Sequence, residues 1–289
     1  MRLSCKFLFR TLAIACLLTG CQTFHPQRNP AKELDQSLAV LGSPQSTPRE
    51  VARAAEDYRR ALSAVLPGLL KGSPNPAFAF SPTKPSGYYL PATFSDVAPV
   101  RNSREITPGL HRPGLGLPAI GQIFPGGENS PRAGYHVPVT VLAFPKKPVN
   151  DSFEVRLADP ARVPSVRMAG RDFPVAMNLA AALDATRATG PRLLDGLGFL
   201  LRPERMQSRL VFLQPYDPEK IPVVLIHGLI STPKMWAPVV KTLLADREIR
   251  RRYQFWFFYY PTGQPVPLSA LQLREPWTRQ HSRIAYAGP

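Results

Sequence analysis

Cysteine is scarce in this chain and is confined to its beginning. Only three cysteines occur among 289 residues, Cys5, Cys16 and Cys21, and none follows residue 21. Structural zinc sites and disulfide frameworks need several such residues at defined spacings. No complete G-x-G-x-x-G motif for a dinucleotide occurs either. We therefore expect no metal site, no cofactor, and a fold stabilised by packing.

Long blocks of one charge are also lacking, although the chain is basic. Lysine and arginine number 36 against 20 acidic residues, which gives a formal net charge of +16. The bases are scattered, and no lysine- and arginine-rich block is interleaved with aromatic residues as in many nucleic-acid-binding proteins. We expect no nucleic-acid partner. The charge could equally serve an anionic lipid or polysaccharide surface.

A run of about 20 apolar residues, as a transmembrane helix requires, is missing. The shorter run at residues 12–18 follows a basic start, which is typical of a secretory signal. It ends in Leu18-Thr19-Gly20-Cys21, which resembles the bacterial lipoprotein box. The resemblance implies that residues 1–20 are a signal peptide and that Cys21 carries lipid, which anchors the chain to a membrane. The alternative is an ordinary signal peptide with a chance cysteine.

By the same resemblance, the residue after the cysteine indicates to which membrane the protein is sorted. Gln22 stands there instead of aspartate, which implies the outer membrane, facing the periplasm. Residues 21–46 are polar and are expected to form a lipidated tether. Thr47, Pro48 and Glu50 then form the pattern of a capping box with proline at the first helical position, which predicts an amphipathic helix over residues 47–70.

Proline is abundant, with 34 occurrences, and it favours loops and edge strands over long helices. Residues 71–215 are expected to hold proline- and glycine-rich loops and then a β-rich accessory module. Alternating apolar residues around Val139 and Val155 indicate its strands. A helix is expected over residues 176–186.

Residues 216–275 contain the pattern that indicates a function. An apolar run at residues 221–226 suits a strand buried on both faces. It ends in His227-Gly228-Leu229, with Trp236 seven residues further along, a helix from about Pro238 and a second apolar run over residues 253–260. This order resembles the start of the α/β-hydrolase fold, in particular its lipase- and esterase-like members. The expected fold class is thus α/β: an incomplete hydrolase-like parallel sheet, preceded by the β-rich module and the amphipathic helix.

The resemblance also implies a site. In that family the main-chain N–H after His-Gly helps to form the oxyanion hole, which here assigns Leu229, with His227 and Gly228 supporting the loop. Such donors stabilise the negative oxygen that develops during acyl transfer. A side chain at Gly228 would block the approach. His227 is not expected to be the catalytic base.

The nucleophile of that family is missing. No G-x-S-x-G occurs anywhere in the sequence. We expect no catalytic residue, and an atypical tail over residues 276–289 in which Pro276 interrupts the preceding helix, as if the reading frame were truncated or shifted near Glu275. With so few strands, the aromatic residues at 255–259 are expected to be partly exposed and the chain poorly soluble.

The sequence leaves two functions open. The first is a membrane-anchored lipoprotein related to serine ester hydrolases, whose full-length relative would act on an ester or acyl lipid and which is itself inactive. The second is a non-enzymatic envelope lipoprotein that binds a protein or glycan through its β-rich module.

Overall fold

The computed structural model describes residues 29–100, 107–124, 126, 129–146, 152–189 and 208–286. The expected signal peptide, the lipid on Cys21 and the first part of the tether lie outside these residues. Among the described helices, none is both long enough and apolar enough to cross a membrane.

Two helices open the described chain. Helix α1 (Pro30–Gly42) begins after Asn29, whose side chain caps it, and buries Leu34, Leu38 and Leu41. The expectation of a tether over residues 21–46 is therefore wrong for this part, because these leucines pack against the next helix. Helix α2 (Pro48–Leu70) has the predicted capping box at Thr47 and continues past Pro67 to Leu70.

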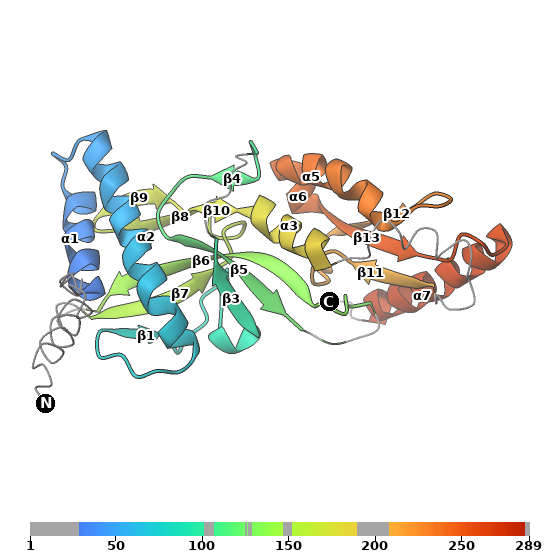
Figure 1. Ribbon diagram of the computed structural model, residues 1–289, viewed down its shortest axis with the longest axis horizontal. Helices are drawn as coiled ribbons and strands as arrows, with labels where there is room; N and C mark the ends of the chain where they lie inside the picture. The colour runs from blue at the N-terminus through green and yellow to red at the C-terminus, as the bar shows by residue number, and fades with distance from the viewer. Residues whose placement is uncertain are drawn as a thin grey trace, which may run out of the picture.

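The largest sheet is mixed and curled (Figure 1). Its strand order is β1-β7-β6-β5-β3, and β2 also pairs with β7. Only β1 and β7 pair in parallel; the other neighbours are antiparallel. The strands are β1 (Phe78–Phe80), β2 (Tyr88–Tyr89), β3 (Asp96–Pro99), β5 (Leu117–Ile123), β6 (Tyr135–Pro145) and β7 (Phe153–Ala158).

Short elements complete this part of the molecule. Strand β4 pairs with β10, and β8 pairs with β9. Helix α3 begins three residues after the expected start at 176. The bounds are η1 (Pro91–Thr93), β4 (His111–Arg112), β8 (Ser165–Met168), β9 (Arg171–Pro174), β10 (Met177–Asn178) and α3 (Leu179–Thr189).

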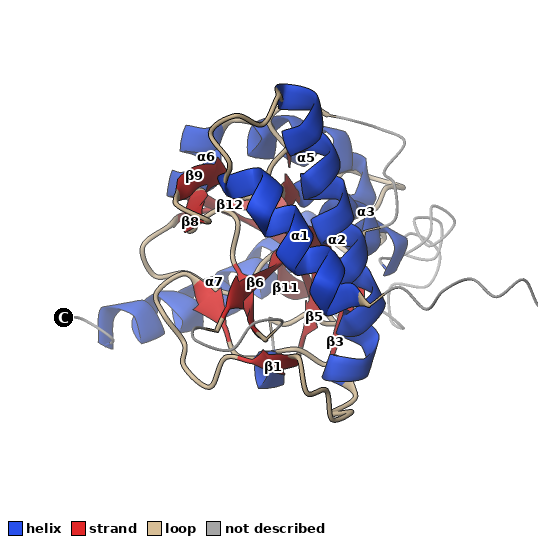
Figure 2. Cartoon of the chain, turned by 90° about the vertical axis from the view of Figure 1, so that its left-hand side faces the viewer, coloured by secondary structure: helices blue, strands red, loops and turns tan. Residues whose placement is uncertain are grey.

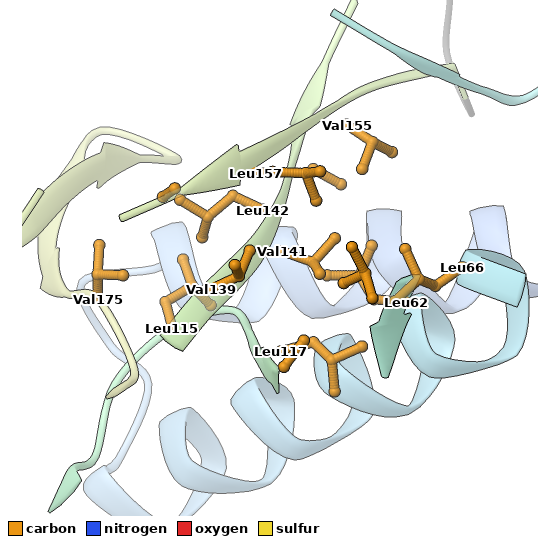
Figure 3. Packing of buried hydrophobic residues seen from close by; sticks show 14 of the residues in the cluster. Leu62, Leu66, Leu115, Leu117, Val139, Val141, Leu142, Val155, Leu157 and Val175 are labelled. Atoms are coloured by element: carbon orange, nitrogen blue, oxygen red, sulfur yellow. The ribbon is translucent and has the colours of Figure 1, made fainter. Parts of the chain in front are cut away.

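Helices α1 and α2 lie side by side across one face of this sheet (Figure 2). Leu62 and Leu66 of α2 approach Val141 and Leu117 in the core (Figure 3). Tyr58 is fully buried, and its hydroxyl donates to the Ala143 carbonyl at 2.9 Å and accepts from the Ala143 N–H at 2.7 Å. The helix pair is thus part of the domain core.

The C-terminal part forms a second sheet of order β11-β13-β12. Strands β12 and β13 are parallel, as the sequence predicts, and β11 is antiparallel to β13. The elements are β11 (Arg209–Phe212), β12 (Ile221–Ile226), η3 (Pro233–Trp236), α5 (Ala237–Ala245), α6 (Arg247–Arg252), β13 (Tyr253–Tyr259) and α7 (Val266–Tyr286). The described chain is therefore a mixed α and β structure.

Three expectations about this part are wrong. Phe255, Trp256 and Phe258 are buried. Trp256 and Phe258 share a core cluster with β11 and the first sheet, where Phe212 stacks on Trp256 with ring centroids 4.3 Å apart. Phe255 is buried on the other side, in a cluster with residues of α3 and α5. Strand β11 was assigned to the accessory module but pairs within the second sheet. Helix α7 passes through Pro276, where a proline removes a main-chain donor but leaves the rest of the helix intact.

Candidate functional site

The candidate site lies at the carboxyl edge of the two parallel strands. Ile226 pairs with Phe258, so the residues that follow each strand meet at one edge. His227 is the first residue after β12, and the loop over residues 227–232 projects at the right-hand end of Figure 1, away from α1 and α2. In open α/β sheets this edge is where ligands bind.

His227 is buried and is held by Tyr260. Its Nδ1 lies 3.1 Å from the Gly228 carbonyl oxygen, and its Nε2 accepts from the Tyr260 N–H at 3.4 Å. The Tyr260 hydroxyl donates to the His227 carbonyl oxygen at 2.8 Å, and the two rings stack with centroids 4.5 Å apart. Burial lowers the pKa of His227, which favours the neutral ring. Both ring nitrogens are thus occupied in holding the chain, a geometry that suits support of the loop.

Leu229 lies at the tip of this loop, with 66% of its surface exposed. Its main-chain N–H has no hydrogen-bond acceptor within the part of the chain that the structure describes. A Cβ atom at Gly228 would meet nothing within 4 Å. No packing contact in the described chain therefore requires glycine at 228, and the space beside the Leu229 N–H is open.

Trp236 follows the loop and binds back to the end of β12. Its indole Nε1–H donates to the carbonyl oxygen of Ile226 at 3.2 Å. Ile226 is the last residue of β12, so this hydrogen bond closes the loop on the end of the strand. The loop over residues 227–235 is consequently fixed at both ends.

The backbone at Ile230 is strained. Its φ is +52°, in the left-handed region that β-branched residues avoid. Such a conformation costs of order 1–3 kcal/mol and is found mainly at functional sites. The loop thus keeps an unfavourable conformation next to the open main-chain donor.

Within the residues that the structure describes, no activated nucleophile accompanies the loop. The hydroxyl of Ser231 donates to the Met235 sulfur at 2.9 Å and lies 3.5 Å from the Thr232 carbonyl oxygen. Its partners within the described chain therefore include no histidine and no carboxylate, which a serine nucleophile requires. In the same ranges, no group of three histidine, cysteine, aspartate or glutamate residues could hold a metal ion.

A basic hollow adjoins the loop. Arg187 of α3, Lys234 of η3 and Lys241 of α5 line an open depression of about 480 Å³, together with Asp184 and Ala188. The sequence did not reveal this hollow, because it depends on the packing of α3 against α5. Tyr260 was missed for a similar reason: its approach to His227 follows from the strand register.

Comparisons with family models, with curated proteins and with solved structures find no match to this chain.

Proposed function

We propose that this chain is a lipoprotein, anchored to the outer membrane through lipid on Cys21, whose C-terminal part is related to serine ester hydrolases of the α/β-hydrolase type. The loop at residues 227–232 would be its oxyanion-binding loop. The observation that carries this proposal is the open main-chain N–H of Leu229, placed directly after a parallel strand.

The chemistry of the loop follows from this placement. In acyl transfer the carbonyl oxygen of an ester becomes negatively charged, and a fixed N–H donor stabilises that charge. Removing one such donor costs about 10²–10³ in turnover in enzymes that have it. Both ring nitrogens of His227 lie against main-chain groups of Gly228 and Tyr260, so His227 orients the loop and is not assigned as the base.

We also propose that the chain does not hydrolyse esters by itself. It has no G-x-S-x-G, and among the described residues Ser231 has no base as a partner. An oxyanion hole without a nucleophile can bind an acyl group or a carboxylate but does not form an acyl-enzyme. The function would then be binding of an ester, an acyl lipid or its carboxylate product.

A chromogenic ester assay tests this. The full chain is incubated with p-nitrophenyl butyrate beside Ser231→Ala. No turnover above the buffer rate is expected for either protein. Turnover that Ser231→Ala abolishes would show that Ser231 is a nucleophile and would refute the proposed inactivity.

The anchor has its own test. Cells that express the full chain are labelled with radioactive palmitate, beside Cys21→Ser and the matched control Cys16→Ser. Label is expected in the parent chain and in Cys16→Ser, in the outer-membrane fraction, and not in Cys21→Ser. Label that persists in Cys21→Ser would refute lipidation at this residue.

A further inference from the structure

Most of the large hydrophobic side chains that the described chain exposes lie in its C-terminal part. Among the described residues, eleven large hydrophobic side chains are exposed, and nine of them lie between residues 221 and 271; the other two are Leu90 and Phe124. Leu229, Ile230 and Met235 are exposed by 66%, 50% and 52%. Leu229 and Ile230 are neighbours in the loop, and the Met235 sulfur lies 2.9 Å from the Ser231 hydroxyl, so these side chains belong to one loop surface. Exposed apolar surface of this kind marks an interaction site.

The two segments that carry these nine side chains contain no carboxylate. No aspartate or glutamate stands between Glu219 and Asp246, or between Glu248 and Glu275. Lys234 and Lys241 lie within the first of these segments and line the hollow beside the loop. Of the residues that line the hollow, only Asp184 is acidic. A partner that fits must therefore present apolar and negatively charged groups together.

We propose that this surface docks onto a bilayer that contains anionic phospholipid. Leu229, Ile230 and Met235 enter the interface between headgroups and acyl chains, and Lys234 and Lys241 face the phosphates. Apolar burial and attraction of lysine to anionic lipid are the two contributions that hold proteins at such interfaces. Ile230 keeps an apolar side chain in the loop despite its left-handed backbone. At a position exposed only to water, asparagine would adopt this conformation at lower cost.

This inference is independent of the ester chemistry. It concerns the side chains of the loop, whereas the oxyanion proposal concerns a main-chain donor. A second copy of the chain would be the other occupant of an apolar face, but two copies would bring the lysines of each hollow toward one another. The charge therefore favours the anionic bilayer.

A local probe tests the docking. In the full chain, Cys5, Cys16 and Cys21 are replaced by serine, and Met235→Cys carries the only thiol, labelled with the environment-sensitive dye NBD. Phe124→Cys, at a side chain of similar exposure (55%), is the matched control. The probe reports only its own surroundings. Binding of residues 1–20 to the vesicles therefore does not produce the signal.

With vesicles of phosphatidylglycerol, the emission of the probe at 235 should rise and shift to the blue, while the probe at 124 should not respond. With phosphatidylcholine vesicles neither should respond. Lys234→Gln and Lys241→Gln should each weaken the apparent affinity for the anionic vesicles about fivefold. Equal responses at 235 and 124, or at the two lipids, would overturn the proposal, and a concentration-dependent blue shift without vesicles would show self-association instead.

Discussion

Replacing Tyr58 with phenylalanine tests whether the N-terminal helices belong to the core. The Tyr58 hydroxyl donates to the carbonyl of Ala143 and accepts from its N–H. Strand β5 begins at Leu117, which pairs with Val141 of β6, so the pairing does not reach Ala143. The N–H and carbonyl of Ala143 therefore need another partner, and Tyr58 supplies it. Burial raises the pKa of Tyr58 far above its ordinary range, so the hydroxyl keeps both roles at any pH at which the fold persists.

The magnitude follows from these contacts. Tyr58→Phe leaves one N–H and one carbonyl unsatisfied in the interior, and each such group costs about 1–3 kcal/mol. The phenylalanine ring fills nearly the same volume, so no cavity adds to this cost. We expect the free energy of unfolding to fall by about 2–4 kcal/mol.

Urea denaturation followed by circular dichroism measures this change. Tyr89→Phe is the matched control, because its hydroxyl makes one hydrogen bond of 3.2 Å to the carboxylate of Asp159 at a partly exposed position. This control should cost less than Tyr58→Phe, because only one hydrogen bond is lost and the Asp159 carboxylate keeps its contacts with the Ala161 N–H and Arg162. A Tyr58→Phe protein no less stable than Tyr89→Phe would refute the assignment of α2 to the core.

Three further predictions concern Gly109, Ile230 and His227. Gly109→Ala should lower the free energy of unfolding by about 2–4 kcal/mol, because Gly109 has a φ of +79° and its new Cβ would lie 2.3 Å from the Ala245 carbonyl oxygen; a neutral effect in urea denaturation would contradict this contact. Ile230→Asn should stabilise the chain by about 1 kcal/mol, because asparagine tolerates the left-handed conformation; the same titration would show no gain if the loop were unstrained. The pKa of His227 is lowered in the folded state, so the unfolded state takes up its proton first; the free energy of unfolding should therefore fall as the pH drops below about 6.5. His227→Gln should reduce this pH dependence, and an unchanged profile would contradict the burial of the ring.

The sequence predicts those elements whose signals are local. The capping box at Thr47 locates α2, and the alternation around Val139 and Val155 locates β6 and β7. The two apolar runs predict β12 and β13, and the residues between them predict the loop and its helix. In each case the residues that form the element also carry its pattern.

The remaining features depend on contacts between distant segments. Helix α1 is short, and its three buried leucines are covered because α2 packs beside it. Strand β11 is separated from β13 by a strand, a 3-10 helix and two α-helices, so its pairing is not visible in its own short run. Tyr260 meets His227 because of the register between β12 and β13, and periodicity alone does not give register. Pro276 lies inside α7, where helical neighbours outweigh one lost donor.

The most direct test of the oxyanion-binding loop is the amide signal of Leu229. The full chain is labelled with ¹⁵N-leucine and titrated with butyrate, whose carboxylate resembles the charged oxygen of an acyl-transfer intermediate. We expect a saturable downfield shift of the Leu229 amide proton, while the amide of Leu244, buried in α5, stays unchanged. A Leu229 amide that does not respond to butyrate, or that moves no more than Leu244, would contradict the account.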